Sequence, residues 1–99
     1  MILRDLAHAR AGDKGDIINI SVIAYDARDY DRLAREVTPE RVKAHLSDIV
    51  VGDVARFELP QLGAFNFVMR RAPRDNVTQS LALDAHGKSL SSALLEMKI

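Results

Sequence analysis

The segment DIINISVIAYD, residues 16–26, contains the strongest β-strand pattern of the chain. β-Branched residues, which favour extended backbone, occur throughout it. Alternate positions place one set of side chains on one face, Ile18, Ile20, Val22 and Ala24, and a second set on the other, Ile17, Asn19, Ser21 and Ile23. Because both sets are largely apolar, the pattern predicts a strand in the middle of a sheet.

Three further segments have strand patterns. Residues 2–8, ILRDLAH, alternate weakly and suit an edge strand. Residues 53–59, DVARFEL, follow Gly52 and alternate imperfectly, and residues 76–84, NVTQSLALD, alternate more regularly. With the central strand they predict a sheet of about four strands.

Helix signals are strongest at residues 38–46, TPERVKAHL. Thr38 can cap the first turn, Pro39 suits the first helical position, and Glu40 favours the positive end of the helix dipole. The charge-rich residues 27–36 predict a short helix or a loop with helical turns. A helix is therefore expected between the central strand and the strand that follows it.

Two later segments have helical spacing. Residues 60–72, PQLGAFNFVMRRA, combine strand propensity with a helical face opened by Pro60, and we predict a helix there although Gly63 weakens it. The helical face consists of Leu62, Phe65, Val68 and Met69. Residues 87–99 carry an amphipathic pattern formed by Leu90, Ala93, Leu94 and Met97. The order of elements predicts one α+β domain over residues 1–99, a split βαβ sandwich.

The composition of the 99 residues excludes several classes of protein. Fourteen basic and fourteen acidic side chains give a formal charge of zero, so no field steers the chain to nucleic acid or to a membrane. The absence of cysteine removes disulfides and thiolate chemistry. No apolar run approaches the roughly 20 residues of a spanning helix, and there is no signal-peptide pattern. We expect a cytoplasmic protein that self-associates readily.

The segment RAGDKGD, residues 10–16, precedes the central strand and combines two glycines with four charged side chains. Gly12 and Gly15 can each adopt positive φ, and the freed N–H groups could then bind an anion, with Arg10 or Lys14 adding charge. The two aspartates of the segment could instead bind a cation, or cap amides in an ordinary hairpin turn. The spacing matches neither a Walker A loop nor GxGxxG.

Other candidate sites have weaker signals. DAHGKSL, residues 84–90, resembles the end of a phosphate loop, but Ala82 stands where such a loop needs glycine, so a strand-to-helix turn is the alternative. The three histidines, His8, His45 and His86, are far apart, and no metal site is predicted. Asn66 lies among apolar residues and needs a structural hydrogen bond or a substrate contact. No catalytic triad or carboxylate pair can be assigned.

Four segments together resemble the C-terminal domain of the acyclic terpene utilisation protein A family. They are LAHARAGDKGDIINISVIA, VTPERV, RFELPQLGAFNFV and SLALDAHGKSLSSALLEM. They occur in the family's order over nearly the whole chain, and the first is the most specific. The family has a large N-terminal domain followed by this small one, which also occurs as a separate short protein. The resemblance implies a ferredoxin-like fold.

The family pattern maps onto three parts of this sequence. The first part comprises Arg10, Gly12, Asp13, Lys14, Gly15, Asp16 and Asn19; the second comprises Pro60, Asn66 and Phe67; the third comprises Ser80, Asp84, Gly87 and Lys88. Two departures occur: Ala11 replaces a usual serine, and APRDNV, residues 72–77, replaces a Gly-Gly pair before the last strand. A backbone contact to an anion is therefore in doubt at the second departure.

The resemblance implies a small subunit or accessory domain that is not catalytic alone. Its partner would be a large chain resembling the family's N-terminal domain, and the pathway would be the catabolism of terpenoid or other branched acyl-CoA compounds. The alternatives are a small module that binds an anion or CoA, and a structural homo-oligomer. No cofactor is expected.

Overall fold

The computed structural model describes residues 1–71 and 90–99. Four strands form one sheet in the order β1-β2-β4-β3, and every neighbouring pair is antiparallel. The strands are β1 (Ala7–Lys14), β2 (Ile17–Ala24), β3 (Val50–Leu59) and β4 (Ala64–Arg71). Strands β2 and β3 are therefore parallel with β4 between them, which makes the β2–helix–β3 segment a split βαβ unit. The predicted four-stranded α+β sandwich, consistent with a ferredoxin-like fold, is confirmed.

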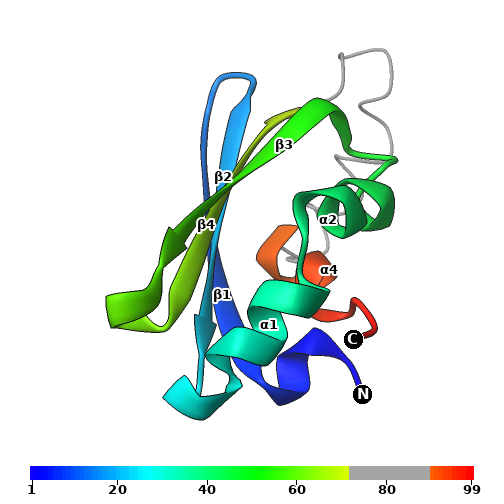
Figure 1. Cartoon of the computed structure of the whole chain (residues 1–99). Coiled ribbons are helices and arrows are strands. Elements are labelled where there is room, and N and C mark those ends of the chain that lie inside the picture. Colours follow the sequence, from blue (N-terminus) through cyan, green and yellow to red (C-terminus); the bar gives the residue numbers. More distant parts are fainter. Residues whose placement is uncertain (72–89) are drawn as a thin grey trace.

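The described residues form three short α-helices, which lie together on one side of the sheet (Figure 1). They are α1 (Tyr30–Glu36), α2 (Pro39–His45) and α4 (Leu90–Leu95), and 3-10 turns occur at η1 (Leu3–Asp5), η2 (Ala27–Asp29) and η3 (Pro60–Leu62). The hydroxyl of Thr38 accepts a hydrogen bond from the backbone N–H of Arg41, as the capping prediction requires. No helix in residues 1–71 or 90–99 is long and apolar enough to cross a membrane.

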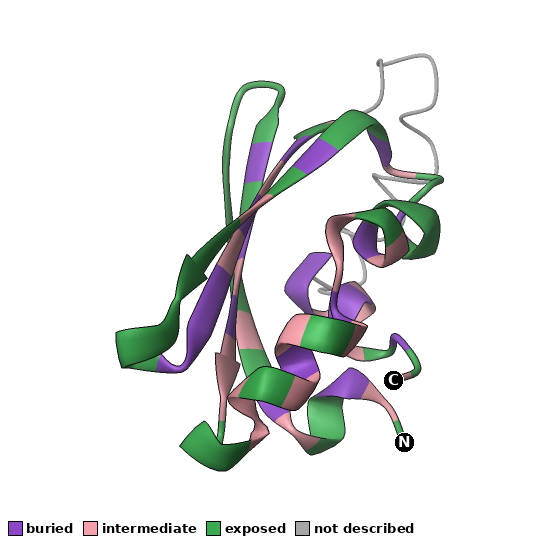
Figure 2. Ribbon diagram, viewed as in Figure 1, coloured by how far each residue is buried: buried purple, intermediate pink, exposed green. Residues whose placement is uncertain are grey.

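The core lies between the sheet and the helices, where the buried residues of both layers meet (Figure 2). The strands contribute alternate side chains, Ala7, Ile18, Ile20, Val22, Val50, Phe65, Phe67 and Met69. The helices contribute Leu33, Val42, Leu90 and Leu94. Each large side chain buried in this way stabilises the fold by about 1.5–3 kcal/mol, so this face of the sheet is committed to packing.

The helix predicted at residues 60–72 is wrong. The segment forms the short turn η3 and then the central strand β4. Phe65, Phe67 and Met69 are buried on the core face, while Val68 between them lies on the other face. The burial therefore has a period of two, and the helical spacing combined residues that do not share a face.

The predicted boundaries of the first strand are also wrong. Leu3–Asp5 form a 3-10 turn, and the edge strand begins at Ala7 and continues to Lys14. Each residue of β1 pairs with one of β2, so the loop expected at residues 10–16 is reduced to a turn at Gly15 and Asp16. Because β1 pairs with β2 along its full length, residues 10–14 are part of a strand and not of a loop.

The remaining strand and helix predictions have mixed outcomes. The strand at residues 53–59 is confirmed within β3, which begins earlier at Val50 and has an irregular register between Val51 and Ala55. The helix at residues 38–46 is confirmed by α2, and residues 27–36, expected as a short helix or a loop with helical turns, form η2 and α1. The C-terminal helix α4 ends at Leu95, before the amphipathic pattern ends at Met97. The strand predicted at residues 76–84 lies outside the described residues.

Candidate functional site

One face of the sheet carries no helix of the described residues (Figure 1), and we call it the outer face. Directly paired residues of antiparallel strands point to the same face. The register therefore places four rows of side chains across the outer face, in the strand order β1, β2, β4, β3. These rows are His8–Ile23–Ala64–Leu59, Arg10–Ser21–Asn66–Phe57, Gly12–Asn19–Val68–Ala55 and Lys14–Ile17–Arg70–Val51.

Five residues of the family pattern occur in these rows: Arg10, Gly12, Lys14, Asn19 and Asn66. Gly12 is paired with Asn19, and Asn66 is joined to Arg10 through Ser21, which pairs with both. The sequence distributes these residues over more than 50 positions. The sheet brings them into adjacent rows on three strands.

Other residues of the pattern lie elsewhere. Asp13 pairs with the buried Ile18 and so points away from the outer face, where its Oδ2 accepts a hydrogen bond of 3.4 Å from the guanidinium of Arg71. The carbonyl of Asp16 accepts a 2.7 Å bond from the N–H of Arg71. In residues 1–71 and 90–99 no group of three His, Asp or Glu side chains could hold a metal ion. Both aspartates thus make contacts with the end of β4.

Three further groups complete the account of the predicted site. Gly15 has a φ of 61°, which supplies the sharp turn between β1 and β2. Phe67 is fully buried in the core, and Pro60 begins the turn η3. The last four predicted residues, Ser80, Asp84, Gly87 and Lys88, lie outside the described residues.

The side chain of Asn66 has an unsatisfied atom. Its Oδ1 is buried and has no hydrogen-bond partner. This oxygen therefore does not make the structural hydrogen bond that the sequence suggested. An unsatisfied buried acceptor costs about 1–3 kcal/mol. A buried group of this kind calls for an explanation, such as strain, an ordered water or a bound partner.

Exposed apolar side chains were missed by the sequence reading. Phe57 is 55% exposed and Leu59 is 40% exposed, and both lie on the outer face beside Asn66 and Ala64. Ile17 and Val51 at the other end of the face are also exposed. Contiguous exposed apolar side chains mark interaction sites. The signal was present in residues 53–59, but the sequence alone does not show which face of that strand helices cover.

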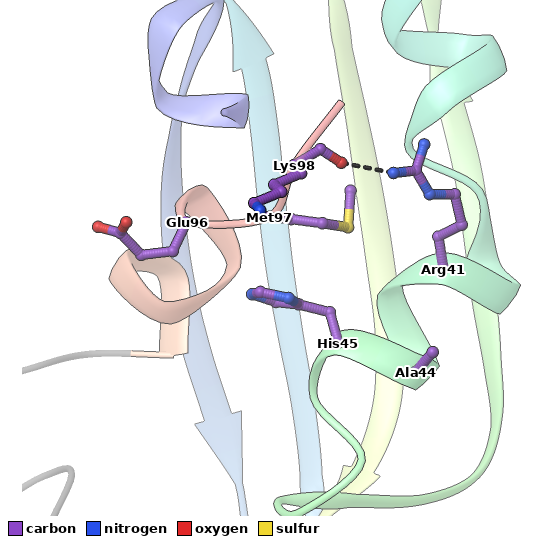
Figure 3. A pocket seen from close by; sticks show the side chains of 6 residues that line it. All are labelled: Arg41, Ala44, His45, Glu96, Met97 and Lys98. Atoms are coloured by element: carbon purple, nitrogen blue, oxygen red, sulfur yellow. Dashed lines mark hydrogen bonds between the residues drawn. The ribbon is translucent and has the colours of Figure 1, made fainter. Parts of the chain in front are cut away.

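A hollow of about 460 Å³ lies on the helix side, between α2 and the C-terminal segment (Figure 3). Its polar groups are already engaged. The guanidinium of Arg41 donates to the carbonyl of Lys98, and Nε2 of His45 lies 2.7 Å from the carbonyl of Ala93. Glu96 is paired with Arg4. These contacts fasten the chain end to α2, and we assign the hollow a structural role.

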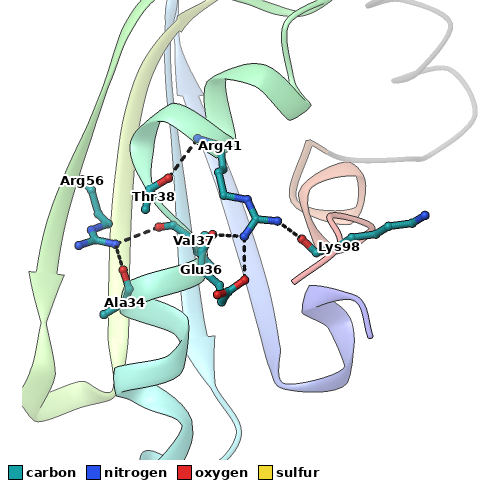
Figure 4. A network of polar contacts seen from close by, with 7 residues as sticks. All are labelled: Ala34, Glu36, Val37, Thr38, Arg41, Arg56 and Lys98. Carbon is teal, nitrogen blue, oxygen red and sulfur yellow. Dashed lines mark hydrogen bonds and ion pairs between the residues drawn. The ribbon is translucent and has the colours of Figure 1, made fainter.

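Two arginines close the C-terminal end of α1 (Figure 4). Nη1 of Arg56 donates to the carbonyls of Ala34 at 2.7 Å and Val37 at 3.0 Å. Nη1 of Arg41 donates to the backbone carbonyl and a carboxylate oxygen of Glu36, both at 2.9 Å. The Arg56 guanidinium also lies 5.1 Å from the centre of the buried Phe65 ring. This network holds the helices on the core face and leaves the outer face untouched.

These features define a small α+β domain whose outer face combines exposed apolar and polar side chains. A family model described as the AtuA ferredoxin-like domain matches residues 1–99. The chain therefore belongs to the AtuA ferredoxin-like domain family, in agreement with the resemblance seen in its four segments. No curated protein and no solved structure matches the chain.

Proposed function

We propose that this chain is an accessory domain or small subunit that binds a large chain resembling the family's N-terminal domain. The two would act together in the catabolism of acyclic terpenoid or other branched acyl-CoA compounds. The observation that supports this function is the gathering of Arg10, Gly12, Asn19 and Asn66 on the outer face, beside the exposed Phe57.

The chemistry of the outer face suits binding more than catalysis. Its four rows contain cations, amides and apolar groups but no carboxylate. No hydrogen bond within residues 1–71 joins Ser21, the hydroxyl of this face, to a base. Small-molecule sites are usually concave, whereas protein interfaces combine exposed aromatic and apolar side chains with polar ones. A partner chain is therefore the occupant that this surface favours.

The binding test uses the purified chain and a purified large-domain chain of the same family from the same organism. Titration calorimetry should detect a complex with the wild type. Phe57→Asp should weaken it at least about 30-fold, because a carboxylate replaces an exposed aromatic side chain of the apolar part of this face. Ala44→Asp is the matched control, since it adds the same charge at an exposed position of α2. Absence of a wild-type complex, or equal loss in both variants, would contradict the proposal.

The pathway is tested by the activity of the large chain on branched acyl-CoA compounds. Adding the wild-type chain should raise this activity, and adding the Phe57→Asp variant at the same concentration should not. A large chain that is equally active with and without its small partner would refute the accessory role.

A second candidate function is the binding of CoA or another anion. It is favoured by three cations on the outer face, Arg10, Lys14 and Arg70. Titration of the isolated chain with CoA and with inorganic phosphate tests it. Binding by the wild type that is lost in Lys14→Ala would support this function, and no heat at millimolar ligand would exclude it.

A further inference from the structure

The outer face is chemically divided along its rows. The four potential cations are His8, Arg10 and Lys14 on the edge strand β1 and Arg70 on β4. The aromatic and aliphatic groups are concentrated toward β3, where Phe57 and Leu59 are exposed. Most of the cations thus lie on β1, and the exposed Phe57 and Leu59 lie at the opposite edge of the face on β3.

The cations of the face have no partners within the described residues. Arg10, Lys14 and Arg70 make none of the ion pairs in residues 1–71 and 90–99, whereas Arg71, which points to the core face, is paired with Asp13. Arg10 and Lys14 are exposed and can receive an external carboxylate. The four rows contain no acidic side chain, and the exposed Asp53 of β3 lies in the irregular stretch between Val51 and Ala55, so the cations of β1 have no acidic neighbour in their own rows.

This charge distribution selects against a second copy of the chain as the occupant. Two copies packed face to face with β1 over β1 would bring their cations together with no carboxylate between them in the described rows. Like charges placed across an interface disfavour association. The complementary surface is one that is apolar and acidic.

We infer that the large partner presents an apolar cluster bordered by carboxylates, with the cluster over Phe57 and Leu59 and the carboxylates over Arg10 and Lys14. The inference rests on the proposed function and names the chemistry of its interface. Arg10 and Phe57 are the ends of one row and are separated by three strand spacings. At about 4.8 Å a spacing, the partner's carboxylates lie about 14 Å from the centre of its apolar cluster.

The middle of that row is polar and adds a directional contact. Ser21 and Asn66 lie between Arg10 and Phe57, and Oδ1 of Asn66 has no hydrogen-bond partner. A partner N–H or hydroxyl placed over this point could satisfy the amide after a small rotation of its side chain. The row therefore requires, in order, an acidic group, a hydrogen-bond donor and an apolar group.

The test measures the dissociation constant of the complex between about 50 mM and about 500 mM NaCl, a range that shortens the screening length several-fold. The wild-type complex should weaken at least about tenfold over this range. The double variant Arg10→Gln, Lys14→Gln should bind at least about tenfold more weakly at low salt and lose most of the salt dependence. The matched control is Arg35→Gln, Lys43→Gln, which removes the same two charges from exposed positions of α1 and α2.

The outcomes separate the two proposals. A control that behaves as the wild type while the outer-face variant loses affinity and salt dependence supports the inference. A complex that forms but has the same salt dependence in both double variants overturns the inference and leaves the accessory role standing. No complex at any salt concentration overturns both.

Discussion

Gly12 of β1 lies directly opposite Asn19 of β2, and a β-carbon added to Gly12 would lie 3.5 Å from Oδ1 of the asparagine. That distance is an ordinary van der Waals contact, and the φ of Gly12 is not positive. Neither backbone strain nor crowding therefore requires glycine here. Because glycine has no side chain, the outer face has open space next to Asn19 that a partner can occupy.

Gly12→Ala should therefore separate binding from stability. The free energy of unfolding in urea should change by no more than about 0.5 kcal/mol. Binding to the large chain should weaken at least about tenfold, because the added methyl group raises the surface at the interface. Unchanged affinity with the same stability would show that Gly12 lies outside the interface.

Gly15→Ala should have the opposite effect. The φ of Gly15 is 61°, a left-handed conformation that costs other residues about 1–2 kcal/mol. The free energy of unfolding should fall by about that amount, while the folded variant binds the large chain as the wild type does. A variant as stable as the wild type would mean that the turn relaxes to another conformation.

Arg56→Met should destabilise the fold. The substitution keeps an apolar side chain over Phe65 but removes the hydrogen bonds to the carbonyls of Ala34 and Val37. Hydrogen bonds from a charged donor contribute about 1.5–3 kcal/mol, and the free energy of unfolding should fall by about that amount. Arg35→Met, at an exposed position of α1, is the control and should change it by less than about 0.5 kcal/mol. Equal losses of unfolding free energy in the two variants would show that the hydrogen bonds of Arg56 to the end of α1 do not stabilise the fold.

Within the described residues the buried Tyr30 hydroxyl meets no partner at full hydrogen-bond geometry, and the backbone of Leu59 is its polar neighbour, so Tyr30→Phe should change stability at neutral pH by no more than about 1 kcal/mol in either direction. The ring would keep its stacking on Phe65, with centroids 4.5 Å apart. Chemical denaturation of both proteins at pH 7 measures the difference. A loss above about 1 kcal/mol would indicate a hydrogen bond to that hydroxyl.

Tyr30→Phe should also change how stability depends on pH in the alkaline range. Burial raises the pKa of the Tyr30 phenol, and the carboxylate of Glu58 adds to the effect. Because the pKa is higher in the folded than in the unfolded chain, stability is complete below the unfolded value of about 10 and is lost as pH rises through the folded value. Tyr30→Phe should lose less stability than the wild type between about pH 9 and about pH 11. The control variant Tyr25→Phe, which changes an exposed ring, should lose as much stability as the wild type over this pH range.

The sequence predicted correctly those elements that form because of interactions between residues close together in the chain. The β-branched run of β2 and the Thr38-Pro39 start of α2 were identified because strand propensity and capping act over a few residues. The region 60–72 was misread because its central position in the sheet, which buries Phe65 and Phe67 on one face, is a property of the tertiary fold.

The candidate site shows the same division. The family pattern named Arg10, Gly12, Asn19 and Asn66 as candidate site residues, and only the sheet register shows that they share one face. Phe57 was missed because alternation in a strand gives two faces and does not say which one the helices cover. The expected glycine loop was wrong because β1 continues through it to Lys14.

Amide chemical-shift mapping of the ¹⁵N-labelled chain, titrated with the unlabelled large chain, tests the role of the outer face most directly. We expect little change in α1 and α2. The largest shifts or line broadening should fall on the outer face, at Arg10, Gly12, Asn19, Phe57 and Asn66. Perturbations confined to α1, α2 and the hollow beside His45, with the outer face unchanged, would contradict it.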